Sequence, residues 1–132
     1  MERIDAALCR KLLPPRDPAG HKGTFGKVCV LGGAVGYTGA PYLTASAAVR
    51  TGCGLVFLGV PENIWAVEAA KCASAMPLPL ADYHGTLSDK ALQKIEEKLN
   101  SCDVLALGPG LGRSPKITRL VLEVLRRTEK SP

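Results

Sequence analysis

The chain has 132 residues, enough for one domain with a buried core. Hydrophobic residues make up 46% of it and charged residues 22%, a balance typical of globular proteins rather than disordered chains. The formal charge of +5 favours anionic partners, but the lysines and arginines are scattered and do not interleave with aromatic residues, which disfavours nucleic acid. No apolar run approaches the roughly 20 residues that span a bilayer, so we expect no membrane partner.

The five cysteines are odd in number and widely spaced, and no two form a C-x-x-C pair. This usage is typical of a reducing compartment, and with no secretory hydrophobic segment at the start it predicts a cytoplasmic protein. Most of the cysteines lie in apolar segments, so we interpret them as small buried hydrophobes rather than ligands or nucleophiles. They are Cys9, Cys29, Cys53, Cys72 and Cys102.

The first clear unit is a strand, a glycine-rich loop and a helix. The apolar run 28–31 predicts a buried strand, and residues 32–39 follow as the loop. The alanine-rich segment 42–49 predicts a tightly packed helix, with Pro41 in its first turn and Gly52 at its end.

The middle of the chain continues this alternation. A second strand is predicted over 55–60 and a second helix over 64–71. Two prolines restrict 76–80 to a short edge strand or a loop. Residues 86–89 match a capping box, and apolar positions within 91–99 recur at helical spacing, which predicts a third helix.

The last unit repeats the first. A strand over 103–107 ends in the glycine-rich segment 108–112, and Ser114 and Pro115 are typical of the cap and first turn of a helix. Strands that alternate with helices predict an α/β fold with a mainly parallel sheet. Residues 128–132 add no strand beside this helix, so we expect an incomplete chain. The apolar stripe of the last helix is Ile117, Leu120, Val121, Val124 and Leu125.

The two glycine loops, 32–39 and 108–112, are the predicted functional region. Both follow strands, and the carboxyl ends of parallel strands meet at one edge of a sheet, where open α/β sheets bind ligands. Glycine admits a ligand close to the backbone, and the two helix N-termini favour an anion. We therefore expect a phosphorylated ligand; the alternative is that the glycines only form tight turns.

Neither loop matches a standard nucleotide fingerprint. Residues 108–112 read G-x-G-x-G rather than the G-x-G-x-x-G of a Rossmann domain. Residues 23–27 hint at a phosphate loop, but His21 and Val28 stand where a Walker motif needs glycine and serine or threonine. Lys22 and Lys27 either supply charge near a phosphate or form a solvated entry to the first strand.

No catalytic or metal-binding cluster is evident. His21 and His84 are too isolated in sequence to define a metal site or a catalytic triad, so we interpret them as structural or surface residues. The acidic residues form no obvious carboxylate pair and fall mainly on predicted helix faces. They include Glu62, Glu68, Asp89, Glu96, Glu97 and Glu123, while Asp103 begins a strand.

Taken together, these blocks resemble the carbohydrate-kinase-like domain of bacterial NAD(P)H-hydrate dehydratases. The resemblance rests on their order and spacing and covers nearly the whole chain. The matching blocks are HKGTFGKV at 21–28, GG at 32–33, GYTGAP at 36–41, AAVRTGCGLV at 47–56, VPE at 60–62 and GPGLG at 108–112.

The resemblance implies a ribokinase-like fold with a layered αβα arrangement. It also implies dehydration of (S)-NADHX or (S)-NADPHX to NADH or NADPH, at the expense of ADP or ATP and with Mg²⁺ as a candidate cofactor. By the same resemblance, Ala40 and Gly110 contact the hydrated dinucleotide, together with Gly39, Gly108 and Gly112.

The later motifs of that family do not occur in this chain. They include a G-x-G-D turn with the catalytic aspartate and much of the nucleotide site. We therefore expect residues 1–132 to be the N-terminal portion of a single domain, with no catalytic residue of its own. Two alternatives stay open: a fragment of a vitamin or sugar kinase, or a dinucleotide-binding remnant without turnover. An exposed sheet edge and an apolar helix face predict a homo-oligomer.

Overall fold

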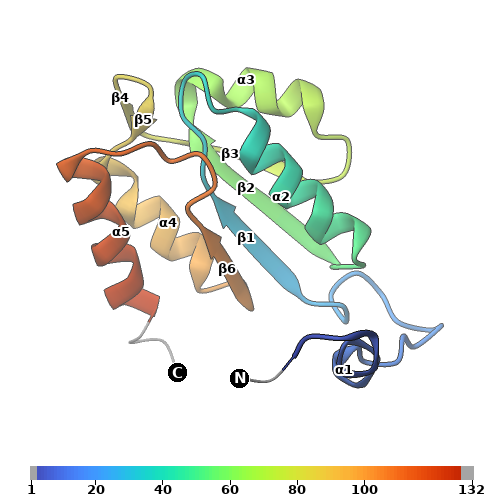
Figure 1. Cartoon of the computed structure of the whole chain (residues 1–132). Coiled ribbons are helices and arrows are strands. Elements are labelled where there is room, and N and C mark those ends of the chain that lie inside the picture. The colour runs from blue at the N-terminus through green and yellow to red at the C-terminus, as the bar shows by residue number, and fades with distance from the viewer. Residues whose placement is uncertain (1–2, 129–132) are drawn as a thin grey trace.

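The computed structural model describes residues 3–128 and contains a four-stranded parallel sheet. The strand order is β3-β2-β1-β6, and each neighbouring pair runs in the same direction (Figure 1). The predicted parallel sheet is therefore confirmed. Its strands are β1 (Lys27–Leu31), β2 (Leu55–Pro61), β3 (Met76–Leu80) and β6 (Val104–Leu107).

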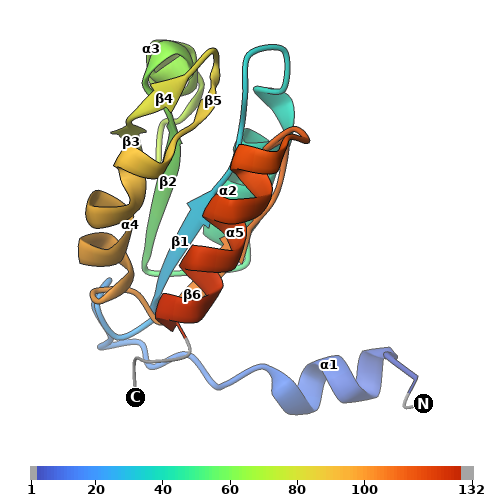
Figure 2. The ribbon, with the colours of Figure 1, turned by 90° about the vertical axis from the view of Figure 1, so that its left-hand side faces the viewer.

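Helices cover both faces of this sheet. Two hydrophobic clusters show the division, because Val30 packs with α2 and α3 whereas Cys29 and Leu31 pack with α4 and α5. Successive strand residues point to opposite faces, so one buried strand serves both clusters. The predicted αβα layering is confirmed (Figures 1 and 2). The helices are α2 (Gly39–Arg50), α3 (Glu62–Lys71), α4 (Leu92–Leu99) and α5 (Pro115–Thr128).

The proline-containing segment forms the edge strand β3. Pro77 and Pro79 pair with Leu58 and Val60 of β2, and within residues 3–128 β3 has no strand on its other side. A proline has no N–H to donate, so it is tolerated in a strand whose other side has no neighbour to bond. Of the two possibilities left open for this segment, the structure forms the edge strand.

The predicted capping box at 86–89 is wrong. Thr86 lies in β5 (Thr86–Leu87), which pairs with β4 (Asp82–Tyr83) in a hairpin, and its hydroxyl donates to the carbonyl of Tyr83. Ser88 precedes a single 3₁₀ turn, η1 (Asp89–Ala91), and its hydroxyl donates to the carbonyl of Ala81. The following helix α4 forms as predicted, because its apolar spacing does not depend on the cap.

A short helix near the N-terminus, α1 (Ala6–Leu12), was not predicted. The carboxylate of Asp5 accepts hydrogen bonds from the amides of Ala7 and Leu8, which caps its first turn. No residue of α1 is buried, and the helix stands apart from the sheet (Figures 1 and 2). With no apolar face packed against the body, it lacks the hydrophobic periodicity that would have indicated it. At the other end, Thr128 is the last residue of α5, and the prediction for 129–132 lies outside the described residues.

The prediction that the cysteines are buried is correct for Cys29 and wrong for Cys9. Cys29 lies on β1 with no exposed surface, whereas Cys9 is exposed on α1. The other three are half-buried, and all five are free thiols. Burial raises the pKa of the Cys29 thiol to about 12, with a smaller contribution from the neighbouring Cys102.

This shift predicts a loss of stability in alkaline solution. Between about pH 9 and pH 12 the unfolded chain releases the Cys29 proton while the folded chain keeps it, so the free energy of unfolding falls as pH rises. The slope from this thiol is at most about 1.4 kcal/mol per pH unit. Urea unfolding of the natural protein and of Cys29→Ala across this range measures it, since the variant lacks the titrating thiol. Parallel pH profiles for the two proteins would contradict the prediction.

Candidate functional site

The two glycine loops follow β1 and β6, the neighbouring strands between which the order of the strands in the sheet changes sides. From β1 the chain moves through α2 to β2 on one side, whereas β6 lies on the other side of β1. The loop after β1 leads to α2 on one face, and the loop after β6 leads to α5 on the opposite face. Open α/β sheets bind ligands at such switch points, outside the carboxyl ends of the strands.

The loops touch each other through their backbones. The amide of Gly33 donates to the carbonyl of Pro109 over 2.8 Å. A Cβ on Gly32 would lie 2.3 Å from that same carbonyl oxygen, and one on Gly110 would lie 2.9 Å from the carbonyl oxygen of Tyr37. No side chain fits at either position. The predicted convergence of the two loops at one edge of the sheet is therefore confirmed.

Other glycines of the loops face open space. A Cβ built on Gly36, Gly39 or Gly108 meets no heavy atom within 4 Å, and all three residues are exposed. The backbone of both loops is thus accessible to a ligand at these three positions. The loops are in contact with each other deeper in the site, at Gly32, Gly33 and Gly110. Ala40 lies beside this junction, 3.5 Å from the Cβ position of Gly110. Of the five residues that we expect to contact substrate, Ala40 and Gly110 lie side by side, and the other three lie in the same two loops.

The two helix N-termini at this edge differ in their caps. Ser114 accepts a hydrogen bond from the amide of Ile117, so the predicted cap of α5 is confirmed. Thr38 occupies the corresponding position before α2, but its side chain makes no capping bond. The first turn of α2 therefore presents backbone amides without a side-chain acceptor, which suits an anion.

The charge of the loops also favours an anion. Residues 32–41 and 108–114 contain no aspartate or glutamate, and Arg113 directly follows the second loop. Lys71 reaches the first loop from α3, where its ammonium lies 2.7 Å from the hydroxyl of Thr38. A phosphorylated ligand on these loops would meet no carboxylate from the loops themselves.

The unpredicted hairpin β4–β5 borders both loops. The amide of Val35 in the first loop donates to the carbonyl of Gly85 over 2.9 Å, and the methyl group of Thr86 lies 3.9 Å from the Cβ position of Gly112. The hairpin turn has positive φ at His84 and Gly85, 48° and 82°. A glycine at the second central position of such a turn was the one local signal that could have indicated it.

Lys22 and Lys27 are not at the site. Both lie near the amino ends of the strands, since Lys27 is the first residue of β1 and Gly54, just before β2, packs against the carbonyl of Lys22. This is the edge opposite the glycine loops. Of the two interpretations offered for these lysines, their position favours the entry to the first strand, because they lie away from the loops on which we expect the phosphate. His21 has a structural role there, accepting a hydrogen bond from the amide of Gly23.

The acidic residues lie mainly on helices, as predicted. One of them is buried rather than exposed on the helix face. Glu68 on α3 is completely buried, although its position was interpreted as an ordinary helix face. Its Oε1 atom pairs with the ammonium of Lys71 over 3.3 Å. Within residues 3–128, no group of three or more histidine, cysteine, aspartate or glutamate side chains is arranged to hold a metal ion.

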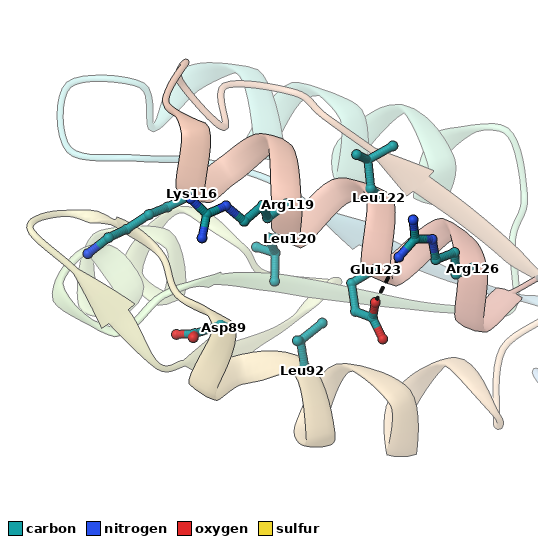
Figure 3. A pocket seen from close by; sticks show the side chains of 8 residues that line it. All are labelled: Asp89, Leu92, Lys116, Arg119, Leu120, Leu122, Glu123 and Arg126. Carbon is teal, nitrogen blue, oxygen red and sulfur yellow. Dashed lines mark ion pairs between the residues drawn. The ribbon is translucent and has the colours of Figure 1, made fainter.

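A separate hollow lies between α4 and α5 (Figure 3). Its volume is about 550 Å³, and none of the five predicted substrate residues lines it. Leu92 and Leu120 supply apolar surface, and Glu123 pairs with Arg126 at one end over 3.8 Å. The remaining lining residues are Asp89, Lys116, Arg119 and Leu122. This hollow belongs to the helical layer, so we do not assign the predicted ligand to it.

Comparison with known proteins identifies the family. A family model described as NAD(P)H-hydrate dehydratase matches residues 28–130. The chain belongs to the NAD(P)H-hydrate dehydratase family. The bifunctional NAD(P)H-hydrate repair enzyme Nnr of Moorella thermoacetica is 43% identical to it over 127 residues, which are 96% of this chain and 24% of that protein. The resemblance inferred from the sequence motifs is confirmed.

Solved structures confirm the fold of this NAD(P)H-hydrate dehydratase family chain. The ADP/ATP-dependent NAD(P)H-hydrate dehydratase of Bacillus subtilis, co-crystallised with ATP and Mg²⁺, superposes with a TM-score of 0.65 at 26% identity, over 89% of this chain and 39% of that one. A ribokinase-like superfamily protein of Enterococcus faecalis superposes with a TM-score of 0.77 at 22% identity, over 94% of this chain and 40% of that one. The predicted ribokinase-like fold is therefore correct.

The chain spans about a quarter of the length of the Moorella relative and about two fifths of the solved chains. Among residues 3–128, no helix has both the length and the apolar character needed to cross a membrane.

Proposed function

We propose that the protein to which this chain belongs dehydrates (S)-NADHX and (S)-NADPHX to NADH and NADPH, with ADP or ATP consumed. The observation that carries the proposal is the meeting of two glycine loops at the switch point of the sheet, in a chain matched by the NAD(P)H-hydrate dehydratase model. Relatives of this chain include the bifunctional NAD(P)H-hydrate repair enzyme Nnr. The family match favours this reaction over a vitamin or sugar kinase.

In this proposal the chain carries the substrate side of the site, residues 1–132 being the N-terminal portion of one domain. The open backbone at Gly39 and Gly108 lets the hydrated dinucleotide approach closely, and Ala40 and Gly110 contact it at the junction of the loops. The uncapped first turn of α2 attracts the pyrophosphate of the dinucleotide. Gly112 completes the second loop beside the hairpin.

ADP or ATP, with Mg²⁺, are the proposed cofactors of the whole protein, and the Bacillus subtilis relative was crystallised with ATP and Mg²⁺. The nucleotide supplies a phosphate that converts the ring hydroxyl of the hydrate into a better leaving group. We assign no residue of this chain to the metal and none to proton transfer. In this proposal the residues present here bind and orient the substrate.

Assays of the full natural protein test this function. We expect ADP- or ATP-dependent conversion of (S)-NADPHX to NADPH, followed by the return of NADPH absorbance, and no phosphorylation of a hydroxymethylpyrimidine or a sugar. Separate reactions with ADP and with ATP give the nucleotide preference. Phosphorylation of either alcohol without conversion of the hydrate would establish the kinase alternative instead. Tight binding of NADPH without any turnover of the hydrate would establish the non-catalytic one.

Two further predictions concern the oligomeric state and the cellular location. We propose that residues 1–132 on their own form a homo-oligomer, since β6 has no neighbour on its outer side in the described residues and Val104 on it is 56% exposed. Leu122 and Leu125 of α5 are also exposed. The cytoplasmic location stays a prediction that rests on the free thiols.

A further inference from the structure

A buried carboxylate lies beneath the first glycine loop. Glu68 has no exposed surface, and its Oε2 atom accepts no hydrogen bond from any residue that the structure describes. Its Oε1 atom lies 3.3 Å from the ammonium of Lys71, one turn further along α3. An ionised carboxylate inside a protein needs a partner charge nearby, so Glu68 holds the Lys71 ammonium at this place.

Lys71 in turn bonds to the first loop. Its ammonium donates to the hydroxyl of Thr38 over 2.7 Å and to the carbonyl of Thr38 over 3.3 Å. With Glu68 this makes three acceptors for a group that has three protons to donate. The donors of Lys71 are therefore occupied by the protein, and its contact with the loop serves to place Thr38 rather than to bind a ligand.

This contact determines how α2 begins. Thr38 is the residue immediately before α2, where a threonine side chain commonly accepts a bond from the first-turn amides. Here the hydroxyl accepts from Lys71 and caps nothing, and the Thr38 backbone is helical, with φ −83° and ψ −15°. The amide end of α2 at Gly39 and Ala40 is left without a side-chain acceptor.

The loop needs such a restraint because of its composition. Gly36 has a φ of 85° and open space around its Cβ position, and Gly39 also lies in open space. Glycine-rich backbone loses more conformational entropy on ordering than other backbone, so a ligand that had to order this loop would bind less tightly. A bond from α3 that orders Thr38 beforehand removes part of that cost.

We propose that Lys71, held in place by the buried Glu68, is a positioning residue that fixes Thr38 and preorganises the Gly39–Ala40 turn for the substrate. The inference rests on the proposed function for the identity of the substrate. The tether itself rests only on the contacts between α3 and the loop.

The test compares Lys71→Met with Lys71→Arg in the full natural protein. For Lys71→Met we expect KM for (S)-NADPHX to rise about tenfold with kcat changed less than about twofold, and the Thr38–Ala40 amides to exchange hydrogen about tenfold faster. Lys71→Arg keeps a cationic donor for the two bonds to Thr38, so its KM and amide exchange are expected to stay close to those of the natural protein. The matched control is Lys94→Met, because Lys94 ties α4 to the carbonyl of Pro79 over 2.8 Å on the other face of the sheet.

A second variant guards against loss of folding when Glu68 is left without its partner. Thr38→Val keeps the ion pair between Glu68 and Lys71 and removes only the hydroxyl that accepts from Lys71. We expect a rise in KM and in amide exchange of about threefold. Thr118→Val is its control, since the Thr118 hydroxyl bonds only to the carbonyl of Ser114 beside its own helix.

The outcomes separate the tether from the proposed function. Unchanged amide exchange at Thr38–Ala40 in both Lys71→Met and Thr38→Val would overturn the tether, whatever the natural protein catalyses. Faster exchange in these variants, with a natural protein that does not convert the hydrate, would support the tether and overturn the function. A fall in kcat without a change in KM would overturn the positioning role, because preorganisation of a binding loop acts on substrate affinity.

Discussion

A Gly32→Ala variant is expected to lose both folding stability and substrate binding. The new methyl group would lie 2.3 Å from the carbonyl oxygen of Pro109, which is backbone and cannot rotate away. The two loops would have to separate, and the bond from the Gly33 amide to that carbonyl would lengthen or break. We expect a loss of about 2 to 3 kcal/mol in the free energy of unfolding. We also expect a rise of at least about tenfold in KM for (S)-NADPHX.

The matched control is Gly39→Ala, a substitution of the same size in the same loop. Its methyl group meets no atom within 4 Å, and Gly39 is the first residue of α2, where alanine favours the helix. Its stability is expected to stay within about 0.5 kcal/mol of the natural protein. KM is nevertheless expected to rise, since the methyl group covers backbone that we assign to the substrate.

Urea unfolding and steady-state kinetics of the two variants measure these effects together. Gly32→Ala with natural stability would show that the loops are not packed as described. Gly39→Ala with both natural stability and natural KM would show that the open face of the first loop does not contact the substrate. The pair thus distinguishes an error in the packing of the loops from an error in the assignment of the ligand.

The sequence was sufficient to predict the features that depend on local patterns. The strand at 28–31 is a continuous apolar run, and the helix after Ser114 has a cap, a first-turn proline and an apolar stripe, so each could be recognised from its own residues. The meeting of the glycine loops followed from one further rule, that parallel strands present their carboxyl ends at the same edge. These elements account for the sheet and for most of the candidate site.

The features that were missed depend on tertiary contacts. Glu68 lies on a helix whose charged residues give no sign of which are buried. Lys71 joins it to Thr38, which lies 30 residues before Glu68 in sequence, so the link could not be seen from local patterns. The hairpin β4–β5 has only two residues in each strand, too few for an alternating pattern to be visible. Thr86 and Ser88 match a capping pattern, but neither side chain caps a helix. The Thr86 hydroxyl bonds within the hairpin, and the Ser88 hydroxyl bonds to the carbonyl of Ala81.

The motif at 21–28 belongs to the scaffold at the start of the sheet rather than to the candidate site. Its lysines suggested a phosphate site, yet the block lies at the edge of the sheet away from the glycine loops. The amide of Gly54 donates to the carbonyls of Phe25 and Gly26, both over 3.1 Å, and the Leu55 amide also donates to Gly26. The block therefore joins the start of β1 to the start of β2, which sets the register of the two central strands.

Gly54→Ala is accordingly expected to be among the most destabilising single substitutions in the chain. A Cβ at this position would lie 1.7 Å from the carbonyl oxygen of Lys22 and 2.7 Å from its carbon, so the whole turn would have to move. Displacement of the turn also weakens the bonds from Gly54 to Phe25 and Gly26. We expect a loss of roughly 3 kcal/mol or more in the free energy of unfolding, measured by urea titration.

Gly23→Ala is the control, because Gly23 lies in the turn that Gly54 packs against. Its methyl group would approach only the exposed ring of His21, at 2.9 Å, and that ring can rotate away at the cost of one hydrogen bond from the Gly23 amide. The expected loss is about 1 kcal/mol. Equal losses for Gly23→Ala and Gly54→Ala would contradict a backbone junction between β1 and β2. A large difference, with the kinetic constants of the folded Gly54→Ala protein unchanged, would place the block in the scaffold, at the edge of the sheet opposite the proposed substrate site.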